Sequence, residues 1–212
     1  MRFVSHLDMQ RLIQRALRRA DIPMSYSNGF NPHPQLSFAT ALSVGHTSSA
    51  EWLDIRLERD MDAEDFAIRM NAALPEGYSV KEAFAAEDKL PALSAMMCGG
   101  DYTVKLIWPG MDAASLQPYL DKLTGSPIVV EKRTKGGLKM VDILPQVTSV
   151  MCEDGSGCII LHISGQLDAS GSLSVELLLK SLFLCANSEP SDIRVHRDTV
   201  HFNEKMQPLA AF

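Results

Sequence analysis

Long apolar runs are missing from this chain of 212 residues. A membrane-spanning helix needs roughly 18 consecutive apolar residues, and the longest candidate, Leu177 to Ala186, is interrupted by Lys180 and Ser181. Near the N-terminus, Arg2 is not followed by an apolar block, so no secretory signal is predicted there. We therefore expect a cytoplasmic protein that does not associate with a membrane.

Cysteine is scarce, and its positions follow no pattern. The four cysteines are Cys98, Cys152, Cys158 and Cys185, and reduced thiols are expected in a chain without an export signal. The spacing Cys-x-x-x-Cys-x-x-Cys, which holds an iron–sulfur cluster with one iron left open, is absent. The spacing from Cys152 to Cys158 is not a standard zinc spacing, and no second pair follows. We expect no metal and no cofactor.

Lysine is missing from the first 50 residues, where five arginines face two acidic side chains. Residues 51–90 carry five basic and eleven acidic side chains, and the net charge of the whole chain is −6. An acidic total argues against general coating of nucleic acid. It leaves one local basic region at the N-terminus.

This basic region is predicted to be a helix. Ser5 is a favourable N-cap residue with Asp8 three positions on, and Pro23 ends the helix because it disfavours helical geometry at Ile22. Helical periodicity separates the apolar and basic side chains onto opposite faces. The apolar face holds Leu12, Ile13, Ala16, Leu17 and Ala20. The basic face holds Arg11, Arg15, Arg18 and Arg19.

The rest of the chain repeats a similar order of elements twice. The first half is predicted to hold strands at 36–42, 51–58 and 78–84 and a helix at 62–74. The second half is predicted to hold a strand at 102–108, a helix at 112–123, hairpin arms at 128–132 and 138–143, a strand at 158–163, a helix at 174–186 and an extended stretch at 193–202.

This order predicts an α+β fold of two ferredoxin-like halves in tandem, each a split βαβ unit. The halves would occupy residues 1–84 and 101–212, with a linker at 85–100 where periodicity fails. The first half lacks most of its initial strand, because only Met1 to Val4 is available for it. That strand lies in the middle of a ferredoxin-like sheet, so its neighbours would stay unpaired. We expect upstream residues, residues 1–5 or a strand of another chain to fill its place.

One stretch of the sequence carries a specific motif. It consists of Phe3-Val-Ser-His-Leu-Asp8, the arginines that follow, and Tyr26-Ser-Asn-Gly-Phe-Asn-Pro-His-Pro34 with Ser37-Phe38. This part resembles the radical SAM-associated protein family, bacterial domains of unknown function fused to, or encoded beside, cobalamin-binding radical SAM proteins. The likeness is specific over residues 3–38 and weak after residue 85. It implies a radical SAM protein as partner, with this chain as a non-catalytic component, and it favours upstream residues as the missing strand.

The arginine face of the helix could bind phosphates, because four guanidinium groups over roughly two helical turns match a nucleic-acid backbone. The alternative is a solvated helix face with Arg11 and Arg15 tethered to Asp8. The hairpin at 132–139 adds a second basic element, with Lys135 and Lys139 as candidate phosphate contacts.

The Asn-Pro-His-Pro segment is the second candidate site. Pro32 and Pro34 fix the backbone on either side of His33, so the imidazole is presented on a stiff segment. A structural turn in which His33 bonds a carbonyl would have the same composition. The candidate binding residues are His6, Asp8, Tyr26, Asn28, Gly29, Phe30, Asn31, Pro32, His33, Pro34 and Ser37.

Other side chains of this region have alternative interpretations. Phe30, Phe38 and Trp52 could stack on bases, or they could belong to the core. His6 is expected to cap or pack, although a His6/His33 acid–base pair would suffice for metal-free RNA cleavage.

These observations favour a non-catalytic accessory module that binds RNA, or the substrate of a partner radical SAM enzyme. A small metal-independent RNA-processing endonuclease using His33 is the first alternative. A protein-interaction adaptor whose arginine face docks on an acidic partner is the second.

Overall fold

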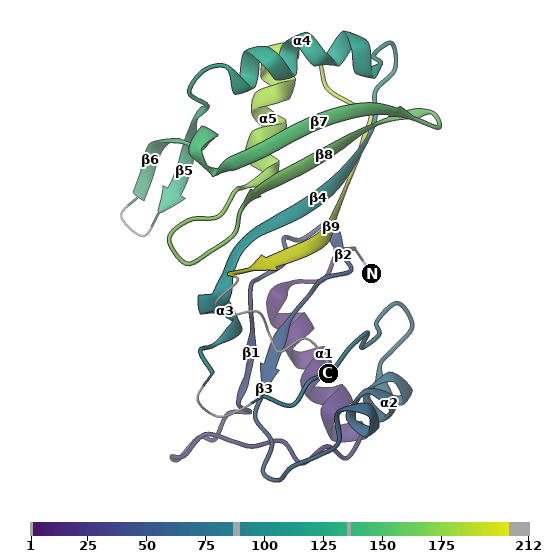
Figure 1. Ribbon diagram of the computed structural model, residues 1–212, viewed down its shortest axis with the longest axis vertical. Helices are drawn as coiled ribbons and strands as arrows, with labels where there is room; N and C mark the ends of the chain where they lie inside the picture. The colour runs from purple at the N-terminus through teal and green to yellow at the C-terminus, as the bar shows by residue number, and fades with distance from the viewer. Residues whose placement is uncertain (1, 87–89, 135–136, 204–212) are drawn as a thin grey trace. The chain divides into compact units, whose positions relative to one another are not determined.

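A computed structural model describes residues 2–86, 90–134 and 137–203 of the chain (Figure 1). It shows a mixed α+β protein that divides into two compact units. Unit 1 consists of Met1–His46, Glu51–Met96 and Phe202–Phe212, and unit 2 of Thr47–Ala50 and Met97–His201. Within the described residues, no helix is both long and apolar enough to cross a membrane. All four cysteines are free thiols.

Unit 1 packs helices against a two-stranded ribbon. Its elements are α1 (His6–Arg19), β1 (Leu36–Phe38), β3 (Leu53–Ile55), α2 (Ala63–Ala73) and the short α3 (Leu93–Met96). β1 and β3 pair antiparallel, with Leu36 opposite Ile55 and Phe38 opposite Leu53. The buried cluster is formed by Ile13, Ala16, Leu17, Ile22, Met24 and Met70, so it lies on α1, on the residues that follow α1 and on α2.

The N-terminus of α1 forms as predicted. The Ser5 hydroxyl accepts a hydrogen bond from the main-chain N–H of Asp8 at 3.2 Å and donates one to the Asp8 carboxylate at 2.7 Å. The predicted apolar stripe is buried at Ile13, Ala16 and Leu17. This agreement follows because a cap and an amphipathic stripe are local signals.

Unit 2 is built on a larger sheet. Its main elements are β4 (Met97–Ile107), α4 (Ala113–Thr124), β7 (Val147–Gly155), β8 (Cys158–Gln166), α5 (Val175–Ala186) and β9 (Asp192–Phe202). A separate hairpin of β5 (Val129–Thr134) and β6 (Gly137–Asp142) and a 3-10 turn, η1 (Leu144–Gln146), lie between α4 and β7. The strand order is β2-β9-β4-β8-β7, where β2 (Thr47–Ser48) pairs parallel with β9.

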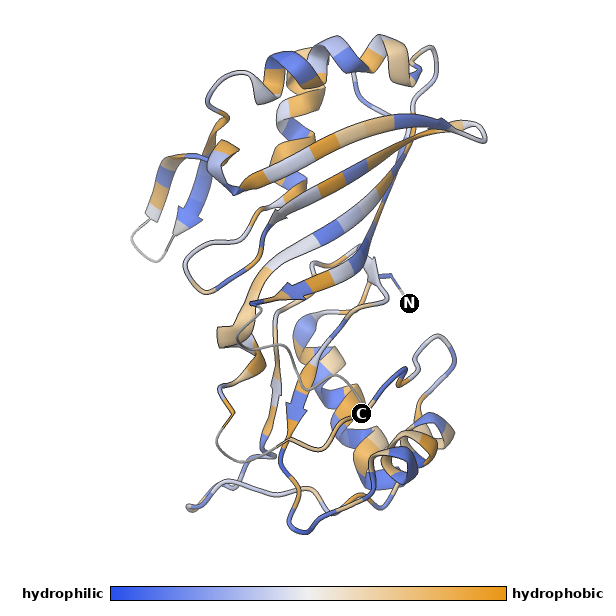
Figure 2. Cartoon of the chain, viewed as in Figure 1, coloured by the Kyte–Doolittle hydropathy of each residue, from blue (hydrophilic) through white to orange (hydrophobic). Residues whose placement is uncertain are grey.

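Without β2 and the hairpin, unit 2 has the element order strand, helix, strand, strand, helix, strand. The four strands lie in the order fourth, first, third, second, which is the ferredoxin-like arrangement expected for this half. Figure 2 shows hydrophobic and hydrophilic stretches alternating along β7 and β8. This alternation places Ile159, Leu161 and Ile163 in the core with almost no exposure.

Several predicted elements differ in the structure. Residues 78–84, predicted as a strand, pair with no described strand, and the strands predicted at 36–42 and 51–58 are only three residues long each. β7 was not predicted, and the hairpin arms predicted near it form their own two-stranded sheet. The expected linker holds α3 and the first residues of β4.

The residues before α1 do not enter the ribbon of β1 and β3. Arg2 instead exchanges two hydrogen bonds with Gly45, one through its carbonyl at 2.8 Å and one through its guanidinium at 2.9 Å. Entry of residues 1–5 into the sheet, one of the three expectations for the missing strand, is therefore wrong for the described residues. Met1 lies outside them.

Candidate functional site

The Asn28–Pro34 loop is a closed hairpin held at its base. Ser25 accepts a main-chain hydrogen bond from Gln35 at 2.9 Å, and the Ser27 N–H donates to the His33 carbonyl at 2.8 Å. The His33 N–H in turn donates to the Ser27 hydroxyl at 2.9 Å. Gly29 has a φ of 126°, which strongly favours glycine. The loop is thus fixed by its own bonds, and its tip is left in solvent.

The tip presents an aromatic ring and several polar groups. Phe30 has a relative exposure of 111%, so its ring contacts almost nothing within the chain. Asn28, Asn31 and His33 are also exposed, and their side chains make no hydrogen bond to the described residues. A single exposed apolar ring is common on protein surfaces, but on a loop braced by its own hydrogen bonds the Phe30 ring is held in a fixed position, where another ring could stack on it.

Other predicted loop residues lie elsewhere or play a different part. Tyr26 bridges Pro34 at the base of the hairpin and is 37% exposed. His6 contacts Gln10 at 3.3 Å and packs edge-on against the Phe38 ring, with centroids 5.2 Å apart. It is therefore a packing residue of α1. Ser37 is an exposed residue of β1, outside the loop.

Two of the four arginines on the basic face have intramolecular partners. Arg11 forms an ion pair with Asp8 at 3.1 Å. The pKa of the Asp8 carboxyl is lowered, mainly by the hydrogen bond from the Ser5 hydroxyl and then by the bond and charge of Arg11. Arg19 donates a 2.6 Å hydrogen bond to the carbonyl of Ala73, the last residue of α2. Its guanidinium thus caps a helix C-terminus.

The other two arginines stay available. Arg15 and Arg18 are exposed, and neither forms a hydrogen bond or ion pair with any residue that the structure describes. They lie about one helical turn apart on α1, and no hydrogen bond or ion pair joins them to the described residues of the Asn28–Pro34 loop, so the arginines and the loop are two separate candidate elements of unit 1.

A family match covers most of these features. The family described as an uncharacterized protein conserved in bacteria (DUF2344) matches residues 1–175. The chain belongs to this family. The match takes in all of α1 and the Asn28–Pro34 loop and ends at Val175, where α5 begins. No curated protein matches the chain. The family description names no reaction, ligand or partner.

Of the two predicted lysines, the one that the structure describes, Lys139, belongs to unit 2. Lys139 is exposed on β6, opposite Lys132 of β5, whereas Lys135 lies outside the described residues. The structure therefore assigns Lys139 and the arginines to different units.

The sequence interpretation missed an arginine of structural importance. The Arg69 guanidinium on α2 donates to the carbonyl of Ala20 at 2.9 and 2.6 Å and also to the carbonyl of Asp21, which follow the end of α1. Together with the bond from Arg19 to Ala73, α1 and α2 each have their C-terminus capped by an arginine of the other helix. A single basic residue in an acidic stretch gave no signal for this role.

Histidine–carboxylate pairs in unit 2 were also missed. His201 contacts the Asp101 carboxylate at 2.7 Å, and the Ser164 hydroxyl donates to the same carboxylate at 2.7 Å. His162 contacts Glu153 at 3.0 Å. These groups come together only through the strand order, so no sequence spacing could reveal them. Among the described residues, no group of three or more potential ligands could hold a metal ion.

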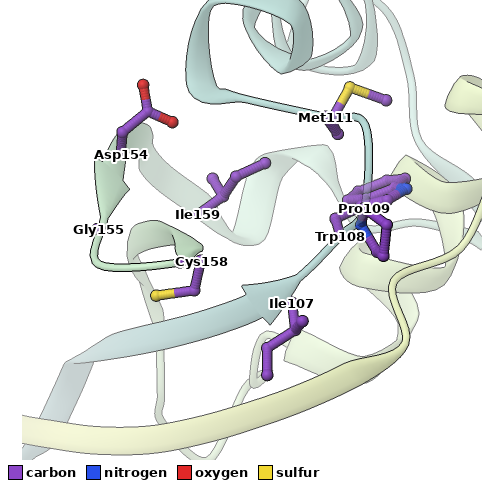
Figure 3. A pocket seen from close by; sticks show the side chains of 9 residues that line it. Ile107, Trp108, Pro109, Met111, Asp154, Gly155, Cys158 and Ile159 are labelled. Carbon is purple, nitrogen blue, oxygen red and sulfur yellow. The ribbon is translucent and has the colours of Figure 1, made fainter.

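Unit 2 also has a cavity of about 480 Å³. Figure 3 shows its walls formed by the β7–β8 turn with Asp154 and Cys158 on one side and by Trp108, Pro109 and Met111 on the other. The Asp154 carboxylate is already used, because it accepts a 2.8 Å hydrogen bond from the N–H of Ala113 at the start of α4. Every candidate site residue lies outside this cavity.

Proposed function

We propose that the chain is a non-catalytic accessory module that binds single-stranded RNA through the Asn28–Pro34 loop and the free arginines of α1. The observation that carries the proposal is the exposed Phe30 ring on a loop braced by its own hydrogen bonds. Stacking of a base on an aromatic ring contributes about 1–3 kcal/mol and tolerates every base.

The neighbouring groups support this ligand class. The amides of Asn28 and Asn31 have donors and acceptors that suit the edges of an unstacked base. Arg15 and Arg18 supply positive charge without an intramolecular ion pair among the described residues, as phosphate contact requires. Catalysis by His6 and His33 has less support, because His6 is held by Gln10 and the Phe38 ring.

A titration of fluorescently labelled single-stranded RNA of mixed sequence, followed by anisotropy, tests this function. Phe30→Ala is expected to weaken binding by about 5- to 150-fold, corresponding to the loss of one stacked base. Phe3→Ala is the matched control, because Phe3 is a second exposed phenylalanine of unit 1, at 75%. It should leave affinity unchanged. Equal losses from both variants, or no binding by the unaltered protein at low salt, would contradict the proposal.

The salt dependence tests the arginines separately. Affinity for RNA falls as salt rises, and each contact with a single-stranded phosphate contributes about −0.7 to the slope of log association constant against log salt concentration. The double variant Arg15→Gln/Arg18→Gln should therefore make this slope shallower by about 1.4. The double variant Lys105→Gln/Lys122→Gln removes two exposed charges of unit 2 and serves as the control. An unchanged slope in the arginine variant would favour an adaptor that docks on protein.

We further propose a radical SAM protein as the partner, which rests on the resemblance carried by residues 3–38. Purification of the tagged protein from its own host should recover a partner with the absorbance of an iron–sulfur cluster. Recovery of RNA without such a partner would separate the two proposals and reject this one.

A further inference from the structure

The cavity of unit 2 has the size and the lining of a small-molecule site. Its volume of about 480 Å³ lies within the range of roughly 300–1,000 Å³ that is typical of ligand pockets. Two segments form its walls: the end of β4 with the turn that follows it, and the β7–β8 turn (Figure 3). The apolar side chains of the lining are Ile107, Trp108, Pro109, Met111 and Ile159. A lining of this kind favours a ligand with a hydrocarbon part.

The wall at the end of β4 is held in place by its own contacts. The Trp108 indole N–H donates to the Ser188 hydroxyl at 3.1 Å, and the indole ring packs edge-on against the Phe183 ring, with centroids 5.4 Å apart. The Ile107 carbonyl accepts from the main-chain N–H and the hydroxyl of Ser191, at 2.7 and 3.0 Å. These groups are fixed before a ligand arrives, so binding would cost little conformational entropy of the protein.

The two walls are also joined to each other. One carboxylate oxygen of Asp154, near the end of β7, accepts a 2.8 Å hydrogen bond from the N–H of Ala113 at the start of α4. Leu106 of β4 and Ile159 of β8 are cross-strand partners in the sheet. The separation of the walls is therefore set by the fold of unit 2.

The cavity carries negative charge. The second carboxylate oxygen of Asp154 forms no hydrogen bond or ion pair with any residue that the structure describes, and Asp154 is exposed. Among the described lining residues, none is a lysine, an arginine or a histidine. Asp112, which follows Met111 in the chain and caps α4, adds a second carboxylate beside the same wall. Charge of this sign attracts a cation and repels an anion.

We propose that this cavity binds a small apolar amine, whose hydrocarbon part lies against Trp108 and Met111 and whose ammonium group donates to the second oxygen of Asp154. An ammonium group has donors only, and its hydrogen bond to a carboxylate is charge-assisted. A neutral molecule of the same shape would gain the apolar contacts alone. An anion would in addition be repelled. The site lies within unit 2 and does not depend on the RNA-binding elements of unit 1.

An NMR titration of the two tryptophan indole N–H signals tests the proposal, with 2-phenylethylamine as the probe. The Trp108 signal should shift with a Kd of about 1 mM or below, as expected for a ligand of this size. The Trp52 signal should stay unchanged, because Trp52 belongs to unit 1. The neutral 2-phenylethanol should bind about 3- to 10-fold more weakly than the amine. The anionic 3-phenylpropionate should bind more weakly still.

Three variants assign the effect to particular groups. Asp154→Asn keeps an oxygen that can accept from Ala113 but removes the charge, so it should weaken the amine by about 3- to 10-fold and leave the alcohol unchanged. Glu153→Gln is the matched control, because Glu153 contacts His162 and points to the opposite face of β7. It should change neither affinity. Met111→Ala removes apolar contacts and should weaken the amine and the alcohol alike.

Several results would overturn the proposal. One is an unshifted Trp108 signal at about ten times the expected Kd of the amine, and another is an equal shift of both indole signals. Binding of 3-phenylpropionate as tight as that of the amine would show that the charge is not recognised. Equal losses of amine affinity in Asp154→Asn and Glu153→Gln would show the same. Unchanged affinities in Met111→Ala would place the bound molecule outside the cavity.

Discussion

Unit 1 and unit 2 use a similar order of elements but differ in how completely they bury them. In unit 2 the buried cluster draws on both helices and on β4, β8 and β9. In unit 1 it lies on α1, the residues after it and Met70, and no described residue of β1 or β3 is fully buried. The difference shows that the central strand provides much of the burial in this architecture, since each of its neighbours depends on it for cover and for hydrogen bonds.

The largest expected difference concerns core truncation. Leu161→Ala in unit 2 should lower the free energy of unfolding by about 2–5 kcal/mol, the range for a fully buried leucine. Ile55→Ala in unit 1 removes a partly exposed side chain and should lower it by less than about 2 kcal/mol. Urea unfolding followed by tryptophan fluorescence measures both. Equal losses of unfolding free energy in the two variants would mean that Ile55 of β3 is buried to the same extent as Leu161 of β8.

Helix capping should not distinguish the two units. Ser5 caps α1 and Ser174 caps α5, and their hydroxyls accept from main-chain N–H groups at 3.2 and 3.3 Å. Ser5→Ala and Ser174→Ala should each lower stability by about 1 kcal/mol, because a cap acts on its own first turn. Glycine at the same two positions should cost only a few tenths of a kcal/mol. A much larger loss in one unit would show that its cap also serves tertiary packing.

A smaller effect concerns a turn of unit 2. The pKa of Asp168 is lowered to about 2, first by the Ser170 hydroxyl, then by the Gln166 amide and the main-chain N–H groups of Ser170 and Gly171. The bonds to the Asp168 carboxylate are 2.6 Å from the hydroxyl and 2.9 Å from the amide. Because the folded pKa is lowered, this stabilisation is present above about pH 4 and is lost as the pH falls through about 2.

An NMR titration of the Asp168 carboxyl carbon checks this value. Ser170→Ala should raise the pKa toward about 4, the ordinary value for aspartate. Ser172→Ala is the matched control, because the Ser172 hydroxyl donates to the Asp168 main-chain carbonyl instead of the carboxylate. An unshifted Asp168 in the unaltered protein would contradict the assigned hydrogen bonds.

Features coded by neighbouring residues could be predicted from the sequence. Ser5 and Asp8 marked the start of α1, and Pro32 and Pro34 marked a stiff segment around His33. Features that depend on distant pairing could not. Residues 78–84 have a strand-like pattern, but a strand forms only beside a partner, and none is described. β7 was missed because the nearby hairpin at 129–142 has a clearer strand signal.

The candidate site shows the same limit. A helical projection placed Arg19 on the basic face with Arg15 and Arg18, which is correct as geometry. It could not show that the end of α2 lies within reach, where Arg19 bonds the carbonyl of Ala73. The pairing of His201 with Asp101 likewise depends on strands that are far apart in the sequence.

The most direct test of the central claim, that no described strand of unit 1 completes its sheet as β4 completes that of unit 2, uses the two tryptophans of the chain. Trp52 lies in unit 1, where it stacks on Phe84, and Trp108 is buried in unit 2 against Phe183. In the Trp108→Phe variant only Trp52 remains, so its fluorescence during urea unfolding reports unit 1. In the Trp52→Phe variant only Trp108 remains, and its fluorescence reports unit 2. The Trp52 signal should change at a clearly lower urea concentration than the Trp108 signal. Coincident transitions, or earlier unfolding at Trp108, would contradict the account.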